Sequence, residues 1–208
     1  KLYPAEGMQN PPSIEGGDII ILSNKAVAIG NSERTDEKAI YHAAKALLGE
    51  GTVERVYEVH LPQKRQYMHL DTVFTILDEN LALTYPDALN AVLQTSLYTL
   101  KEIREDKVII KREVLKESLL TILEREIPHL EILHTADGNP DYAMREQWFD
   151  GANVFAIGPR RVISYNRNIH TNRALREMGV EVLEIPSSEL SRGLGGPRCM
   201  TMPLSRSR

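Results

Sequence analysis

The sequence predicts an α+β fold built from repeated strand–strand–helix–strand (ββαβ) modules. Two observations support this prediction. The same order of short apolar runs and one helical stretch occurs three times along the chain, and in each copy the first two runs are separated by a turn. One ββαβ module has an apolar sheet face and a single helix to cover it, so neighbouring modules must pack together. We therefore expect a fan of repeats.

The first repeat covers about residues 15–61. Its helix is predicted to begin with Thr35 as the cap, because Asp36 and Glu37 then fall in the first turn, where the helix dipole favours acids. Gly49 is expected to end it. Its predicted strands are 18–22, 26–30 and 56–59. Its predicted apolar face consists of Ile40, Ala43, Ala44 and Leu47.

The second repeat covers about residues 69–134. Its helix is predicted from about Glu113 to Ile127, because Pro128 stops it. An insertion at 87–112 precedes that helix, and leucines at helical spacing predict a further helix within it. These leucines are Leu89, Leu93, Leu97 and Leu100. The predicted strands of this repeat are 73–77, 81–85 and 130–133.

The third repeat covers about residues 151–186. Its helix is predicted to be capped by Thr171 and closed by Gly179. The predicted strands are 153–157, 161–165 and 180–185. Each repeat thus places a hairpin and a returning strand around one helix.

Composition narrows the functional class. The chain has 208 residues, of which 42% are hydrophobic and 26% are charged, enough for one good core or two small ones. No apolar run approaches the roughly 18 residues that span a bilayer, and the amino terminus lacks a signal core, so we expect a soluble, cytoplasmic protein. The net charge of −4 argues against a general nucleic-acid binder. Because the chain opens with Lys1 rather than Met, we expect the middle of a longer protein.

Polar clusters occur at the same place in each repeat, the start of its first strand. These clusters are Glu15-Gly16-Gly17-Asp18, His69-Leu70-Asp71 and Asp150-Gly151-Ala152-Asn153. Equivalent strand starts converge on the axis of a fan. Polar groups at a position that would favour apolar packing indicate a functional site.

His69 and Asp71 are separated by one residue, which on a strand would place both side chains on one face. An imidazole and a carboxylate could then act on one ligand, although an ordinary polar surface strand has the same pattern. The other histidines form no i, i+4 pair and there is a single cysteine, so no metal site is expected. Arg34 precedes a helix amino terminus, where a cation gains nothing from the dipole. It is therefore either an anion ligand or a solvated surface residue.

The only cysteine, Cys199, follows a glycine-rich stretch that begins at Arg192. This stretch lacks the Gly-Lys-Ser/Thr ending of a phosphate-binding loop, so that interpretation is rejected. The glycines would let the backbone wrap closely around a small ligand, and Arg192 and Arg198 are expected to favour the thiolate. The alternative is a buried structural cysteine.

Five segments, in this order and spacing, resemble the arginine deiminase family. They are Ser13-Ile14-Glu15-Gly16-Gly17-Asp18, Ile29-Gly30 with Ser32-Glu33-Arg34-Thr35, Met68-His69-Leu70-Asp71-Thr72, Tyr165-Asn166-Arg167-Asn168 and Gly195-Gly196-Pro197-Arg198-Cys199-Met200. The resemblance implies a pentein fold, a fivefold fan (α/β propeller) of ββαβ repeats, of which three are present here. It also implies hydrolysis of L-arginine to L-citrulline and ammonia without a cofactor.

The resemblance also implies roles for individual residues. Cys199 matches the nucleophile and His69 the general acid and base, while Asp71 and Glu15 match carboxylates around the guanidinium. Matching substrate-binding positions are Arg34, for the substrate carboxylate, and Gly193, near the α-amino group. Residues 1–208 would then form a partial catalytic domain whose cysteine loop spans 191–204. Leu194 stands where many members carry arginine, which puts the control of that loop in doubt.

Two other functions stay open. A related guanidino-group enzyme would act on agmatine or a methylated arginine or transfer the amidino group, although Arg34 argues for a substrate with a free carboxylate. The second open function is that of a non-catalytic half-domain, because family chains are about twice the length of this one. The expected partner is L-arginine, with neither nucleic acid nor membrane. Open sheet edges leave self-association, or association with the missing amino-terminal half, as further options.

Overall fold

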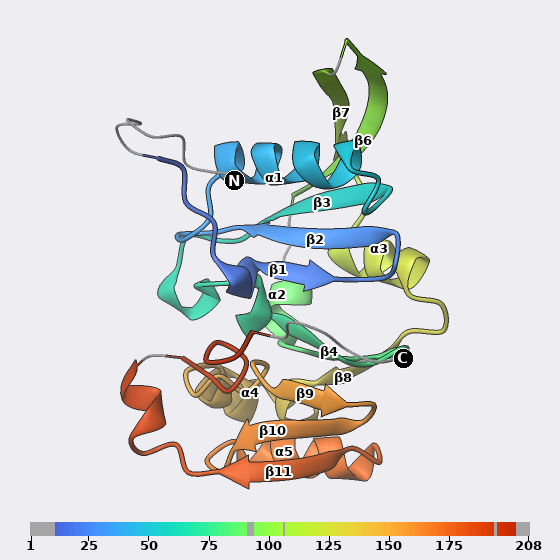
Figure 1. Ribbon diagram of the computed structural model, residues 1–208. Helices are drawn as coiled ribbons and strands as arrows, with labels where there is room; N and C mark the ends of the chain where they lie inside the picture. The colour runs from blue at the N-terminus through green and yellow to red at the C-terminus, as the bar shows by residue number, and fades with distance from the viewer. Residues whose placement is uncertain (1–10, 91–93, 106, 194, 203–208) are drawn as a thin grey trace. The chain divides into compact units, whose positions relative to one another are not determined.

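The computed structural model describes residues 11–90, 94–105, 107–193 and 195–202 (Figure 1). Its described residues form two compact units. Unit 1 contains the described residues up to Leu70 and those between Val92 and Glu126, and unit 2 contains Asp71 to Ala91 and Ile127 onward. Among the described residues, no helix is both long and apolar enough to cross a membrane.

Three sheets contain the three repeats, and all share one topology. The first two strands are antiparallel, and the strand that follows the helix adds parallel to the second. The first sheet contains β1 (Ile19–Ile21), β2 (Ala26–Asn31) and β3 (Arg55–His60). The second contains β4 (Phe74–Asp78), β5 (Leu81–Thr84) and β8 (Glu131–His134). The third contains β9 (Phe155–Gly158), β10 (Arg161–Tyr165) and β11 (Glu181–Ile185). The predicted order of strands is therefore found in all three repeats.

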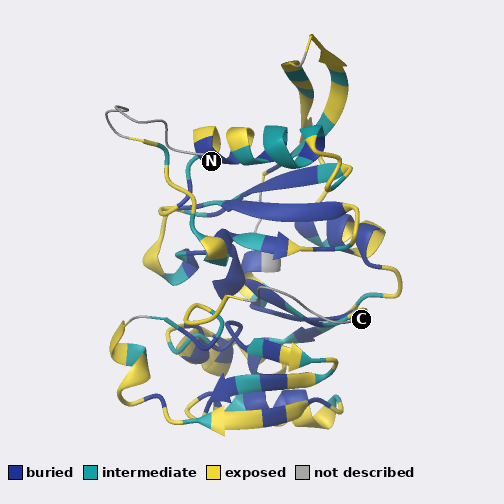
Figure 2. Cartoon of the chain, viewed as in Figure 1, coloured by how far each residue is buried: buried dark blue, intermediate teal, exposed yellow. Residues whose placement is uncertain are grey.

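In unit 1, helix α1 (Glu37–Gly49) packs on the first sheet. Its buried residues join side chains of β2, β3 and β6 (Thr95–Arg104) in one core cluster, which contains Val27, Ile29, Ile40, Ala44, Leu48, Val56 and Tyr98. Strand β2 is buried along nearly its whole length (Figure 2). The helix cap differs from the prediction by one residue. Asp36 is the N-cap and its side chain accepts from the Ala39 amide at 3.0 Å, whereas Thr35 accepts the Glu15 amide at 3.0 Å.

The predicted helix with the four leucines is wrong. Leu97 and Leu100 lie in β6 (Thr95–Arg104), which forms a hairpin with β7 (Lys107–Leu115). The first residues of β6 pair antiparallel with β3, and this pairing between distant segments outweighs the local leucine spacing. The outer part of the hairpin is largely exposed (Figure 2). Leu93 lies outside the described residues, and Leu89 belongs to the short helix α2 (Pro86–Asn90).

The helix of the second repeat is shorter than predicted. The segment from Glu113 to Leu115 belongs to β7, and α3 runs from Leu119 to Glu126 within unit 1. The carboxylate of Glu126 accepts two hydrogen bonds from Arg55, at 2.8 and 2.9 Å, and one from the Tyr57 hydroxyl at 2.5 Å. These bonds join α3 to β3.

In unit 2, α5 (Ile169–Glu177) lies beside the third sheet. A core cluster contains residues of this helix and of both unit 2 sheets, namely Leu77, Leu81, Leu83, Leu133, Val154, Ala156, Val162, Ala174, Leu175, Val180 and Val182. Thr171 is not the cap of α5 as predicted, because Asn168 holds the N-cap position. The first turn of α5 is instead held by hydrogen bonds to the buried Glu146, whose carboxylate accepts from the amides of His170 (2.8 Å) and Thr171 (2.9 Å). Glu146 comes from α4 (Pro140–Gln147), a helix that the sequence analysis did not predict.

Candidate active site

Unit 1 contains an acid, an imidazole and a guanidinium that are bonded in series. Glu15 lies just before a 3-10 turn at Gly16–Asp18, and its Oε2 is 2.6 Å from Nε2 of His69. Its other oxygen, Oε1, accepts from Nε of Arg34 at 3.0 Å. Partial burial disfavours the charged carboxylate, but the bonds from His69 and Arg34 outweigh it, so the pKa of Glu15 is lowered. An ionised carboxylate on one ring nitrogen orients an imidazole and stabilises its protonated form.

Asp18 holds the main chain next to His69. Its Oδ1 accepts the amide of Leu70 at 2.9 Å, and its Oδ2 accepts the hydroxyl of Ser32 at 2.7 Å. Burial raises the pKa of Asp18, although these hydrogen bonds oppose the shift. Gly30 lies against this side chain so closely that a Cβ there would overlap Oδ1. The close approach therefore requires glycine at position 30.

The strand predicted for His69 and Asp71 is not present. Leu70, Asp71 and Thr72 form a 3-10 turn, and β4 begins only at Phe74. The two side chains therefore do not share one face of a strand. His69 belongs to unit 1 and bonds Glu15, whereas Asp71 belongs to unit 2.

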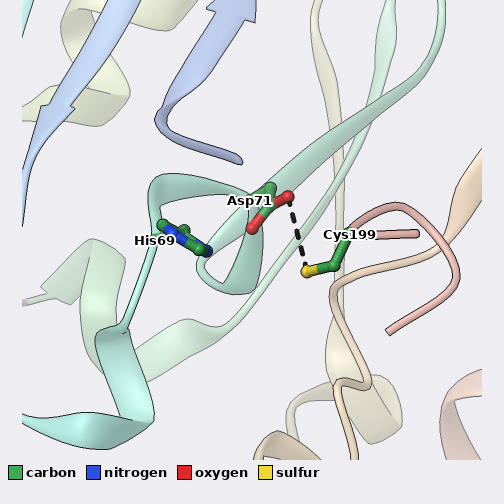
Figure 3. Close-up of side chains that lie close together, drawn as sticks. All are labelled: His69, Asp71 and Cys199. Carbon is green, nitrogen blue, oxygen red and sulfur yellow. Dashed lines mark hydrogen bonds between the residues drawn. The ribbon is translucent and has the colours of Figure 1, made fainter. Parts of the chain in front are cut away.

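Unit 2 brings Asp71 and Cys199 together, although 128 positions separate them in the sequence. Sγ of Cys199 lies 3.9 Å from Oδ2 of Asp71, the contact drawn as a dashed line in Figure 3. The same oxygen accepts from Nη1 of Arg198 at 2.6 Å. The Asp71 side chain is fully buried. A guanidinium group is thus already bound to the carboxylate beside the thiol.

The expectation that Arg192 and Arg198 favour the thiolate is wrong. Cys199 is exposed as a residue, so it is not the buried structural cysteine of the alternative interpretation. The groups packed around its thiol, followed by the nearby charge of Asp71, nevertheless raise the pKa of Cys199 to about 12. The charge of Arg198 is directed to Asp71, and Arg192 pairs with Glu189 at 3.3 Å on the surface. Hydrogen bonds from the main chain of Gly196 and the side chain of Asn153 lower the pKa of this thiol, but they do not outweigh the two causes that raise it.

Sequence reasoning placed Asp150 and Asn153 in a polar cluster but gave them no role. Burial, followed by the charge of Asp71, raises the pKa of Asp150 to about 7. Asn153 is fully buried, and its Oδ1 accepts the amides of Arg198 and Cys199, both at 3.1 Å. The available signal was the repeat itself, because Asn153 holds the place in its cluster that Asp18 holds in the first.

The predicted cysteine loop also contains Gly193 and Leu194. Gly193 ends a 3-10 turn that begins at Leu190, and open space surrounds the position of a Cβ there. Leu194, the departure from the family pattern, lies outside the described residues.

Comparison with solved structures identifies the class of fold. The chain resembles the N-terminal domain of ArgZ bound to product, an arginine dihydrolase from Cyanobacteria, with a TM-score of 0.61 and 19% identity over 91% of this chain and 55% of that one. It also resembles DDAH from Pseudomonas aeruginosa complexed with citrulline, with a TM-score of 0.58 and 19% identity over 93% and 56% of the two chains. With three ββαβ repeats of one topology, this is the fold of the pentein superfamily.

Comparison with known sequences identifies the family. The model of the arginine deiminase family matches residues 5–206. Arginine deiminases of Oenococcus oeni and Latilactobacillus sakei are 40% and 42% identical to the chain, each over 93% of its length. The chain belongs to the arginine deiminase family. It spans about half the length of these relatives, 46% and 47%.

Proposed function

We propose that the chain carries the nucleophilic part of an enzyme that hydrolyses L-arginine to L-citrulline and ammonia, and that it forms the carboxy-terminal half of that enzyme. The observation that supports this most directly is the guanidinium of Arg198 on Asp71, 2.6 Å from the oxygen that faces the Cys199 thiol. The carboxylate already binds the chemical group that the substrate would present. Forked hydrogen bonds between a guanidinium and carboxylates would fix the carbon that is attacked.

Cys199 is the proposed nucleophile. Its thiol proton passes to the imidazole of His69, and the sulfur adds to the central carbon of the substrate guanidinium. The carbon then releases one nitrogen as ammonia, which leaves an amidino group bonded to sulfur. A guanidinium carbon is a poor electrophile because three nitrogens donate into it, so a thiolate serves better than a hydroxyl. The bound cation also offsets the carboxylates that raise the thiol pKa, so substrate binding itself promotes ionisation.

His69 is the proposed general acid and base. It gives a proton to the departing ammonia and then takes one from the water that attacks the amidino carbon, after which the carbon–sulfur bond breaks and citrulline leaves. Glu15 is proposed to hold the imidazole in position, through the 2.6 Å contact, in addition to facing the substrate cation. An ionised carboxylate partner favours the protonated imidazole, the form that can give a proton to the departing ammonia.

The substrate has to compete for two of these groups. Arg198 occupies an oxygen of Asp71, and Arg34 donates to Glu15 while it is proposed to bind the substrate carboxylate. Gly193 is proposed to lie near the α-amino group. Agmatine lacks the carboxylate for Arg34, so we expect arginine to be turned over in preference to agmatine.

The test measures citrulline and ammonia release from L-arginine, with agmatine in parallel and Cys199→Ala as the blank. It is run with the 208-residue chain and with the chain extended to the length of its relatives. Citrulline that depends on Cys199 in either sample supports the proposal. Absence of turnover in both, with folded protein, contradicts it. Turnover in the long protein alone shows that the chain by itself is a non-catalytic half.

A further inference from the structure

We propose that Asn153 is a positioning residue that clamps residues 195–199 of the cysteine loop to the main chain of Asp71. The inference rests on the proposed function for its kinetic consequence, but its structural part can be tested without turnover. Asn153 lies two residues before β9, is fully buried, and belongs to none of the groups to which the reaction assigns a role.

The Asn153 amide bonds both parts that the reaction needs to hold together. Its Oδ1 accepts the amides of Arg198 and Cys199, each at 3.1 Å, and its Nδ2 donates to the main-chain oxygen of Asp71 at 3.3 Å. A carboxamide is one of the few side chains that can accept and donate at once in this way. One side chain therefore joins the nucleophile to the residue that supplies the carboxylate.

Two glycines of the loop, Gly195 and Gly196, allow it to lie close to its hydrogen-bond partners. A Cβ on Gly196 would overlap Oδ1 of Asn153, so only glycine lets the loop approach the amide so closely. The hydroxyl of Tyr165 donates to the main-chain oxygen of Gly195 at 2.7 Å and fixes the preceding residue. The loop is thus held at Gly195, Arg198 and Cys199.

Neutrality is the second reason for an amide at this position. The titratable and charged groups around Asn153 and the loop that it holds, among the described residues of unit 2, are Asp71, Asp150, Arg198, Cys199 and Tyr165. A carboxylate at position 153 would be a third acid beside a thiol that has to ionise.

The first experiment measures hydrogen exchange at the amides of Arg198 and Cys199 in the wild type and in Asn153→Ala. Removal of Oδ1 takes away the acceptor of the Cys199 amide and leaves the Arg198 amide the main-chain oxygen of residue 153 at 3.4 Å. We therefore expect exchange at Cys199 to be at least about tenfold faster, with a smaller increase at Arg198. Exchange in β10 serves as the internal reference and should not change. Asn172→Ala is the matched control. Asn172 is also fully buried, but its amide donates to the main-chain oxygen of Tyr165 at 3.0 Å, so exchange in the loop should stay at the wild-type rate.

The second experiment measures citrulline formation by the same variants in the form of the protein that turns over arginine. Since a displacement of about 1 Å can cost 10²-fold in rate, we expect kcat of Asn153→Ala to fall about 10²-fold while KM changes less than about threefold. A residue that only supports folding would lower the active fraction without separating kcat from KM.

Asn153→Asp keeps the shape if Asn153→Ala fails to fold. When protonated, the carboxyl group introduced by this substitution has one acceptor and one donor like the amide, whereas its ionised form loses the donor and adds charge. We expect near wild-type loop exchange, and a kcat relative to wild type that falls as pH rises.

Three outcomes would overturn the proposal. Unchanged exchange in Asn153→Ala shows that the amide does not hold the loop. Faster exchange with unchanged kcat shows that the clamp does not serve the reaction, and a pH-independent kcat ratio in Asn153→Asp contradicts the need for the donor. A wild type that makes no citrulline counts against the proposed function, and the exchange result still decides whether the clamp exists.

Discussion

Asp18 in unit 1 and Asn153 in unit 2 occupy the same step of their repeats and perform similar tasks with different chemistry. Each follows a glycine two residues earlier, is fully buried, and accepts main-chain amides from a distant segment. Each also has its Oδ1 against a glycine whose Cβ would overlap it, Gly30 for Asp18 and Gly196 for Asn153. The difference lies in what their partners offer.

The partners of Asp18 are donors, the hydroxyl of Ser32 and the amide of Leu70, and a carboxylate accepts from both. Asn153 must also donate, to the Asp71 carbonyl, and its surroundings already contain two acids. The two residues therefore have the same structural role in their repeats, while the charge of the side chain differs with the donors and acids that surround it. Substitutions at these residues and at their partners test that conclusion.

Asp71→Asn removes the carboxylate of the residue whose main-chain oxygen accepts from Asn153. The variant loses the charge that binds a guanidinium, so we expect kcat/KM for arginine to fall about 10³-fold or more. The thiol pKa should fall too, because the Asp71 charge contributes to its elevation. Kinetics and the pH dependence of cysteine alkylation measure the two effects. Asp78→Asn, which removes a carboxylate paired with Arg160, is the control and should retain activity. Full turnover by Asp71→Asn would mean that the guanidinium binds elsewhere.

Gly30→Ala introduces a Cβ that would overlap the side chain of Asp18, and Gly196→Ala introduces one that would overlap the side chain of Asn153. Gly30 lies within the buried strand β2, so its Cβ should cost about 2 to 3 kcal/mol of unfolding free energy. Gly196 lies in a loop, so we expect a smaller loss of stability but faster exchange of the Cys199 amide. Chemical denaturation and hydrogen exchange separate these effects. Gly16→Ala is the control, because open space surrounds its Cβ, and a similar loss there would contradict the argument.

Asp150→Asn removes one of the two acids near Asn153. The folded state raises the pKa of Asp150 from 3.8 to about 7, so the folded protein retains a proton that the unfolded chain releases. The stability contribution is complete below pH 3.8 and is lost as pH rises toward 7. We expect the variant to be more stable than wild type at neutral pH by up to about 4 kcal/mol, with the difference vanishing in acid. Thermal denaturation across pH measures it. A constant difference would show that charge is not the cause.

Asp18→Asn gives unit 1 the amide of unit 2. Burial raises the pKa of Asp18, so its contribution to stability is likewise greatest below its ordinary pKa and decreases as pH rises. The variant should flatten that dependence and change stability at neutral pH by no more than about 1 kcal/mol. The same denaturation series tests it, with Asp78→Asn again as the control. An unchanged slope would contradict the assignment to Asp18.

The strands of the repeats were predictable because each one is a short, continuous apolar run in the sequence and is bounded by turn residues. The β6–β7 hairpin was not, because Leu97 and Leu100 match helical spacing while pairing with β3 decides the structure. A signal did exist in the β-branched run Val108-Ile109-Ile110, which favours a strand.

The residues of the candidate site were predictable by type, but their contacts were not. The sequence marked Glu15, His69, Asp71 and Cys199, yet a strand was assumed where a 3-10 turn occurs. Asn153 gave no local sign of its role, because the amides it binds lie 45 and 46 residues away. Hydrogen bonds over that separation follow from the tertiary fold and have no sequence pattern.

The turn at Leu70–Thr72 carries the chain from unit 1 into unit 2. Asp18 fixes the amide of Leu70 within unit 1, and Asn153 fixes the carbonyl of Asp71 within unit 2. The two anchors thus hold the peptide groups on either side of the bond that joins Leu70 to Asp71. The main chain is held on each side by a buried side chain of its own unit, so loss of one anchor leaves the other in place.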